Sequence, residues 1–253
     1  MDIRKIMNGE ASMEELNSQL LDLDSEFRFK CRKCGKCCKH QNTILFTARD
    51  IFNIAKKLNT STEDVINQYA ETYIGSVSRI PVVHMVPRGP NQACPFLEDG
   101  KCSIHNCKPT VCALYPLGRV IVNAESVMKG LTPDGEFMVK YMLNDTDCGS
   151  QKRTNTVRTW LARFGIPEHD EFFLLWNDVV VELTSTVHAM ETSNVSQEVF
   201  GYVWNAFFKT LYLSYEVTHE FMPQFEHNAA VLRKMCHELQ QAVEKLQNDQ
   251  CDD

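Results

Sequence analysis

The stretch FKCRKCGKCCKH, residues 29–40, places four cysteines in the pattern C-x2-C-x2-C-C, at Cys31, Cys34, Cys37 and Cys38. Two cysteines three positions apart can turn their sulfurs toward one ion, because the chain folds back in a tight knuckle between them. Cys37 and Cys38 are adjacent, so we expect their side chains to point apart. They would then serve two metal centres, or one of them would stay outside the ligand set. The pattern predicts that the surrounding segment folds around bound metal.

A second cysteine run, CPFLEDGKCSIHNCKPTVCALYPLG, spans residues 94–118. It offers further sulfur ligands, and one more cysteine lies in a later Asp-Cys-Gly turn that could close a site. These residues are Cys94, Cys102, Cys107, Cys112 and Cys148. Cys236 and Cys251 lie outside both runs, and we expect neither to bind metal. The first run alone does not complete a site, so segments more than 50 residues away must return to it.

The ligand spacing suits two kinds of metal centre. Zinc takes four tetrahedral thiolates, often from C-x2-C knuckles. A C-x2-C-x2-C run followed by a Cys-Pro pair is also the ligand pattern of a [4Fe–4S] cluster, and Cys94 is followed by Pro95. Here 56 residues separate Cys37 from that pair, compared with about three in a bacterial ferredoxin. We favour an iron–sulfur cluster over zinc, and the spacing leaves both open.

The composition is that of an ordinary globular protein. The chain has 253 residues, 43% of them hydrophobic and 23% charged, so it can bury a core without help from disulfides or metal. Its 11 cysteines are an odd total and the N-terminus carries no apolar signal segment, which argues against a secreted disulfide scaffold. No stretch approaches the ~20 apolar residues of a membrane span. We therefore expect a cytoplasmic protein without a membrane partner.

Charge is divided unevenly along the chain. Residues 26–119 carry 14 Lys and Arg against 7 Asp and Glu, whereas the whole chain carries 26 against 33. The positive excess can offset the charge of metal-bound thiolates, or it can attract an anionic ligand or partner. Aromatic residues are no denser in this basic segment than elsewhere, so we do not expect nucleic acid as a partner.

Two helices are predicted between the cysteine runs. Thr47 with Asp50, and Ser61 with Asp64, have the spacing of capping boxes, in which each side chain satisfies a backbone amide at the start of a helix. The apolar residues that follow recur at helical spacing. The expected buried positions are Ile51, Ile54, Ala55, Leu58, Val65, Ile66, Tyr69 and Tyr73.

Short strands and a long helical region complete the predicted fold. Extended segments are expected at residues 44–46, 79–86, 119–123 and 136–143, with a turn at Asp99-Gly100 and a short helix near Pro109. Residues 154–248 show apolar periods of about 3.6 residues, typical of helices. The predicted fold class is α+β and predominantly helical. It has three parts: an N-terminal helix (1–24), a cysteine-cluster metal-binding domain with short strands (25–150) and a helical C-terminal region (151–253).

These motifs in combination resemble the YkgJ-type CxxCxxCC cysteine-cluster family, which is proposed to chelate zinc or iron and includes relatives of flagellin lysine N-methylases. The resemblance covers roughly residues 27–150 and rests on FKCRKCGKCC, ILFTARDI, CPFLEDGKCSIHNCKPTVCALYPL and the late Cys148. It implies metal ligands at Cys31, Cys34, Cys37, Cys38, Cys94, Cys102, Cys112 and Cys148. Cys107 is optional in that pattern. Because the family's chemistry is mostly unassigned, the resemblance points to metal rather than to a reaction.

Three functions are compatible with these features. The first is metal binding by one or two cysteine-ligated centres that at least hold the structure together. The second is an iron–sulfur-dependent enzyme that modifies a protein side chain, as the methylase relatives imply. The third is a zinc-stabilised module that presents its acidic helical region to a protein partner. The sequence does not decide whether the protein is an enzyme. His40, His84 and His105 could also ligate, although hydrogen-bonding or surface roles are favoured.

Overall fold

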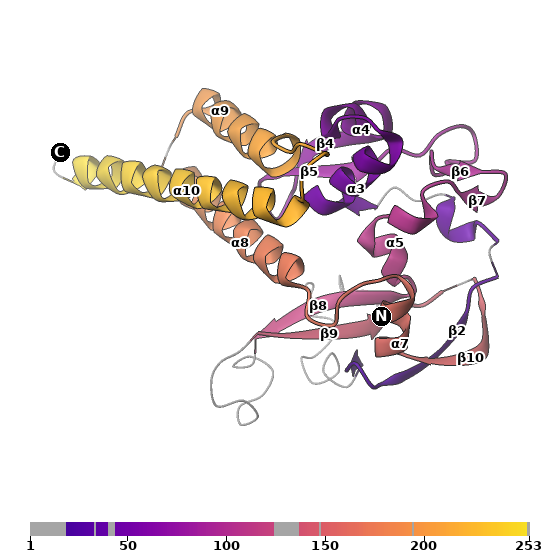
Figure 1. The fold of residues 1–253 in the computed structure, drawn as a ribbon. Coiled ribbons are helices and arrows are strands. Elements are labelled where there is room, and N and C mark those ends of the chain that lie inside the picture. Colours follow the sequence, from indigo (N-terminus) through magenta and orange to yellow (C-terminus); the bar gives the residue numbers. More distant parts are fainter. Residues whose placement is uncertain are drawn as a thin grey trace. The chain divides into compact units, whose positions relative to one another are not determined.

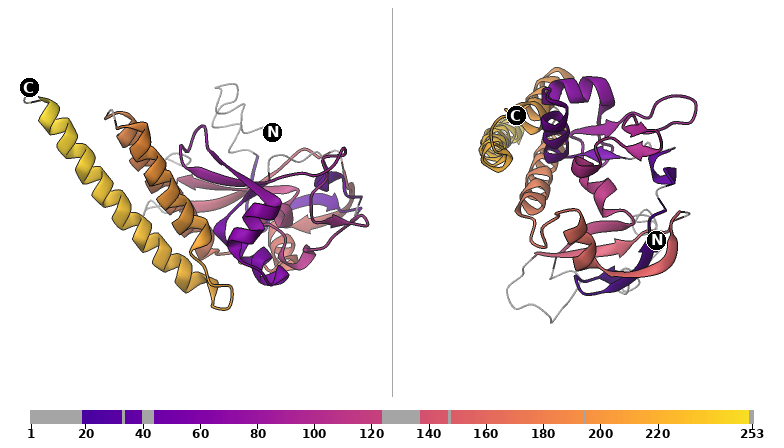
Figure 2. Two further views of the ribbon diagram at one scale, coloured as in Figure 1. Left: turned by 90° about the horizontal axis from the view of Figure 1, so that it is seen from above. Right: turned by 45° about the vertical axis from the view of Figure 1, so that its right-hand side comes forward.

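The computed structural model describes residues 19–32, 34–39, 44–123, 137–146, 148–193 and 195–251 (Figures 1 and 2). The chain divides into two compact units. Unit 1 takes its residues from 1–39, 97–101 and 110–169, and unit 2 takes its residues from 40–96, 102–109 and 170–253. Both units therefore draw on the predicted cysteine-cluster domain and on the predicted C-terminal region. The division at residues 24 and 150 remains a prediction.

Unit 1 contains a two-stranded ribbon and a three-stranded sheet, both antiparallel. The ribbon pairs β2 (Glu26–Lys30) with β10 (Ser150–Thr156). The sheet has the order β1-β9-β8, in which β1 is Leu20–Leu21, β9 is Phe137–Leu143 and β8 is Leu117–Asn123. Because side chains of a strand alternate between its two faces, β2 buries Phe27 and Phe29 and exposes the three residues around them.

Aromatic rings form the core of unit 1. Trp160 belongs to α7 (Val157–Arg163), and its ring lies edge-on to Phe27 at 5.6 Å and to Phe29 at 5.8 Å between centroids. Its indole N–H donates a buried 2.9 Å hydrogen bond to the carbonyl of Leu114. Leu114 is the last residue of α5 (Thr110–Leu114), the short helix predicted near Pro109. One tryptophan thus joins the ribbon to α5 through packing and a hydrogen bond.

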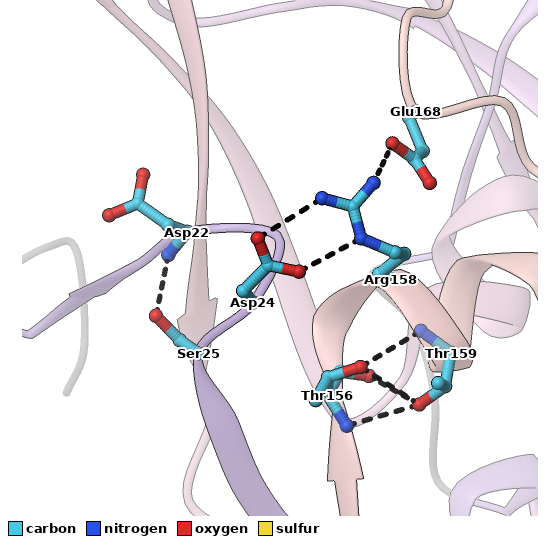
Figure 3. A network of polar contacts seen from close by, with 7 residues as sticks. All are labelled: Asp22, Asp24, Ser25, Thr156, Arg158, Thr159 and Glu168. Atoms are coloured by element: carbon cyan, nitrogen blue, oxygen red, sulfur yellow. Dashed lines mark hydrogen bonds and ion pairs between the residues drawn. The ribbon is translucent and has the colours of Figure 1, made fainter.

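An exposed ion-pair network joins the segment before β2 to α7 (Figure 3). The Arg158 guanidinium donates to both carboxylate oxygens of Asp24, at 2.9 and 3.1 Å, and to Glu168. Thr156 and Thr159 form the capping box at the start of α7, just below this network. These contacts place the beginning of β2 beside the end of β10, in agreement with the register of the ribbon.

Unit 2 contains the two helices that the capping boxes predict. α3 (Ala48–Leu58) starts at the Thr47–Asp50 box and α4 (Thr62–Tyr69) at the Ser61–Asp64 box, so both predictions are confirmed. Unit 2 also contains a three-stranded antiparallel sheet of order β3-β5-β4, and two of its strands lie within the predicted extended segments at 44–46 and 79–86. Its strands are β3 (Leu45–Phe46), β4 (Ala70–Ile74) and β5 (Pro81–Met85).

The C-terminal part of unit 2 is mostly helical. Its helices are α8 (Glu171–Glu191), α9 (Gln197–Phe208), the π-helical turn Lys209–Leu213 and α10 (Phe221–Cys251). α10 packs along α8 (Figures 1 and 2). Leu183 on α8 and Leu232 on α10 belong to the same buried apolar cluster as the strand residue Val83. The predicted α+β, predominantly helical class is confirmed. No helix within the described ranges is both long and apolar enough to cross a membrane.

Several details differ from the sequence-based expectation. The expected helix at 1–24 falls largely outside the described residues, and its end is wrong because Leu20–Leu21 form strand β1. Tyr73 is 46% exposed on β4 rather than buried on a helix, since α4 ends at Tyr69. The C-terminal region predicted to be helical (151–253) begins in strand β10, which extends to Thr156. The predicted turn at Asp99-Gly100 is confirmed between β6 (Leu97–Glu98) and β7 (Lys101–Cys102).

Candidate metal centre

The antiparallel ribbon brings the first cysteine run next to Cys148. Ser150, the first residue of β10, pairs with Lys30, the last residue of β2. Cys31 directly follows Lys30, and Cys148 comes two residues before Ser150. Two cysteines far apart in sequence therefore lie at the same end of one ribbon in unit 1.

A glycine next to Cys148 presses the chain against the aromatic core. Gly149 has a φ of +77°, a left-handed conformation that side chains disfavour. A Cβ at this position would lie 2.4 Å from a ring carbon of Phe29, which is far inside van der Waals contact. The Phe29 ring is buried and already packs against Trp160, so it has little room to give way. Only glycine fits here, and the close approach fixes the backbone that carries Cys148.

Tyr115 contacts the sulfur of Cys148. Its hydroxyl oxygen lies 3.2 Å from the Cys148 Sγ, and its ring lies edge-on to Phe29 with 6.0 Å between centroids. Burial, followed by the contact with Cys148, raises the pKa of Tyr115 above its ordinary value. The phenol is thus protonated at neutral pH. The negative charges of Cys148 and, less strongly, of Cys37 contribute to this rise in the pKa of Tyr115.

Cys37 and Cys38 lie in a short 3₁₀ helix, Lys36–Cys38. Their sulfurs are 4.0 Å apart, so the expectation that they point away from each other is wrong. The physical reason is that successive side chains of a 3₁₀ helix differ by about 120°, whereas those of a strand point to opposite faces. Two thiolates bound at ~2.3 Å to one tetrahedral ion are separated by about 3.8 Å. The pair therefore has the spacing of two ligands of a single ion.

Basic side chains surround the ribbon end. An open hollow of about 550 Å³ is lined by Lys30, Cys31, Arg32, Ser150 and Lys152. Three of these five residues are cations, and the other two carry a thiol and a hydroxyl. Such surroundings offset the negative charge that several thiolates bring to one site.

Three cysteines of the second run belong to unit 2. Cys94, Cys102 and Cys107 are half-buried and pack against its apolar core. Burial raises the pKa of the Cys107 thiol, while Lys57 partly offsets that rise and Cys102 adds to it. Cys107, optional in the sequence pattern, belongs to this group.

The predicted ligands thus occur in both units. Six of them lie in unit 1: Cys31, Cys34, Cys37, Cys38, Cys112 and Cys148. Cys31 and Cys34 are exposed, and the other four are half-buried. Cys94 and Cys102 belong to unit 2. Within the described part of the chain, no group of three or more His, Cys, Asp or Glu side chains is already gathered closely enough to hold an ion.

Other sequence candidates have simpler explanations. His84 lies on β5, with its Nε2 atom 3.8 Å from the Glu71 carboxylate. Cys236 is buried in α10, as expected for a core residue. His40 lies outside the described residues. Tyr115 was not predicted as a site residue; its only sequence signal is its position three residues after Cys112.

Thiols from separate segments, two of them with sulfurs 4.0 Å apart, are the kind of donor that soft metal ions such as zinc and iron prefer. Residues 30–155 match the model of the CxxCxxCC family, described as a "putative zinc- or iron-chelating domain". The chain therefore carries a domain of this family, and the resemblance predicted from its cysteine runs is confirmed. No curated protein and no solved structure matches the chain.

Proposed function

We propose that the protein chelates a metal ion at the end of the β2–β10 ribbon, with Cys37 and Cys38 as two ligands of the same ion. The 4.0 Å separation of their sulfurs carries this proposal, because it is close to the ligand separation in a tetrahedral thiolate site. Cys148 is the third ligand in this proposal, supported by the Lys30–Ser150 pairing, which brings the chain around Cys148 to the same ribbon end as the first cysteine run. Cys31, Cys34 and Cys112 are the predicted sources of the fourth.

Two cysteine ligands on the same ion favour some metal centres over others. A [4Fe–4S] cluster has four irons and four cysteine ligands, so each iron takes a single cysteine, whereas each iron of a [2Fe–2S] cluster takes two. Zinc accepts up to four thiolates on one ion. Two sulfurs on one ion therefore favour zinc or a two-iron cluster over the four-iron cluster that the Cys-Pro motif suggests.

Cys94, Cys102 and Cys107 form a second thiolate group in our proposal. Their common packing against the core of unit 2 supports this assignment. It corresponds to the two-centre arrangement that the sequence left open. The cytoplasmic location, the protein partner, the protein-modifying enzyme and the zinc-stabilised interaction module remain predictions.

Metal analysis of anaerobically purified protein tests the proposal. We expect stoichiometric zinc in a colourless sample, or iron with sulfide in a brown one, and Cys37→Ser and Cys38→Ser should each lose metal. Cys251→Ser, outside both cysteine runs, is the matched control and should retain the wild-type content. Wild-type protein without zinc or iron, or equal metal content in Cys37→Ser and Cys251→Ser, would contradict the proposal.

A further inference from the structure

We infer that Tyr115 is a positioning residue for the metal centre, and that its hydroxyl donates a hydrogen bond to the sulfur of Cys148. The inference rests on the proposed function. Its geometric basis is the 3.2 Å separation between the Tyr115 oxygen and the Cys148 sulfur, which is well within hydrogen-bond range for a sulfur acceptor.

The surroundings of Tyr115 hold its hydroxyl at this position. The ring lies edge-on to the buried Phe29, with an interplanar angle of 83°. The preceding residue, Leu114, is anchored by the hydrogen bond from Trp160 to its carbonyl oxygen. A side chain held by ring packing and by a fixed backbone neighbour is preorganised to orient another group.

Contacts of its own backbone also hold Cys148 in position. The Thr146 hydroxyl donates a 3.2 Å hydrogen bond to the backbone carbonyl of Cys148. Gly149 presses against Phe29, the same ring that packs on Tyr115. Backbone contacts therefore fix where Cys148 lies, and the Tyr115 hydroxyl is aimed at its sulfur.

The direction of the hydrogen bond follows from the chemistry of the two groups. A cysteine that ligates metal is a thiolate, which can accept but not donate. A tyrosine side chain offers an O–H group, which can donate to such a sulfur. The O–H of Tyr115 therefore donates, and it withdraws negative charge from the sulfur. Outer hydrogen bonds of this kind orient a ligand and tune the electronic properties of the centre.

Tyr115→Phe separates this role from packing, because it removes the hydroxyl and keeps the ring. The probe is cobalt(II) added to metal-stripped, full-length protein, since sulfur-to-cobalt charge-transfer absorption reports directly on the bound thiolates. We expect Tyr115→Phe to shift this absorption and to weaken cobalt binding by about 10–100-fold. Tyr202→Phe, at a position 67% exposed on α9, is the control and should match the wild type.

A second test, made in the Cys148→Ser variant, shows whether Tyr115 acts through the Cys148 sulfur. In Cys148→Ser protein, the Tyr115→Phe change should have no further effect on the charge-transfer absorption, because its acceptor sulfur is gone. Unchanged absorption and affinity in Tyr115→Phe alone would overturn the role of Tyr115 while leaving the proposed metal centre standing. A wild-type protein without any thiolate–cobalt absorption would overturn both.

Discussion

The side-chain amide of Asn155 donates a 2.9 Å hydrogen bond to the backbone carbonyl of Phe29, across the β2–β10 ribbon. This bond lies beside the point where the pairing of β10 shifts register, between Ser150 and Thr154. A bulged strand leaves backbone groups without their regular ladder partners. A buried side chain thus supplies a donor where the ladder is interrupted, one residue before Lys30 and the first cysteine run.

Asn155→Ala should destabilise the ribbon and lower metal content together. Removing the donor leaves the Phe29 carbonyl desolvated, and an unsatisfied buried acceptor costs about 1–3 kcal/mol in the free energy of unfolding. Urea denaturation and metal analysis of the same preparations measure both effects. Asn205→Ala, at an exposed position of α9, is the control. Equal stability and metal content in the two variants would contradict this account of the ribbon.

Gly149→Ala should be more damaging than an equivalent change at another left-handed glycine. Gly165 has a φ of +63° and open space where a Cβ would lie, so Gly165→Ala reports only the backbone cost of about 1 kcal/mol. In Gly149→Ala the new Cβ also collides with the Phe29 ring. Overpacking of this kind costs a further ~1–3 kcal/mol in the free energy of unfolding. Thermal or urea unfolding of both variants measures the difference. Indistinguishable stabilities would show that the Phe29 ring can move aside.

Local signals were sufficient for the helix starts but not for the ribbon. Thr47 and Asp50 satisfy each other's backbone groups within four residues, so the sequence alone located the start of α3. β10 has the sequence SQKRTNT, in which only Asn155 is buried, and it therefore lacks the apolar alternation by which strands are recognised. Its partner β2 lies far away in the chain, and no local pattern encodes that pairing.

Local sequence signals also predicted one part of the candidate site and missed another. Cysteine spacing identified the first run, because ligand spacing is a local property. The orientation of Cys37 and Cys38 depended on a 3₁₀ turn that the spacing does not specify. The contact between Tyr115 and Cys148 depends on where α5 and the start of β10 meet the aromatic core. Such a contact arises only from the packed fold.

Asp170→Ala should destabilise unit 2 strongly. Asp170 accepts two hydrogen bonds from the Arg49 guanidinium, at 2.8 and 2.7 Å, and also caps the first turn of α8. Its side chain is only 3% exposed, so the variant leaves Arg49 without its carboxylate in a largely buried place. We expect a loss of about 3 kcal/mol or more in the free energy of unfolding.

Glu171→Ala, the exposed next residue of the same helix, is the control for Asp170→Ala. In the Arg49→Ala/Asp170→Ala double variant, the loss should be smaller than the sum of the two single losses, because the double variant leaves no lone charge behind. Urea denaturation of the full set measures this coupling. Strict additivity would mean that the two side chains contribute independently.

The Asp24–Arg158 ion pair should stabilise the fold at neutral pH and lose this effect as the pH falls. The hydrogen bond from Arg158 holds the pKa of the Asp24 carboxyl below its ordinary value of 3.8. A carboxyl whose pKa is lower in the folded state stabilises the fold above its unfolded pKa, and loses that contribution as pH falls through the folded value. Asp24→Asn should therefore be less stable than the wild type at neutral pH, and the difference should be smaller at about pH 2.5, below the ordinary pKa of 3.8.

Because Asp24 is 80% exposed, the effect at neutral pH should be small and should shrink further in ~0.5 M NaCl. Urea denaturation at the two pH values, with and without salt, measures it. Glu26→Gln, which changes an exposed carboxylate on β2, controls for the loss of one negative charge near the same strand. A stability difference between Asp24→Asn and wild type that persisted unchanged below pH 3 would show that Asp24 acts through something other than its charge.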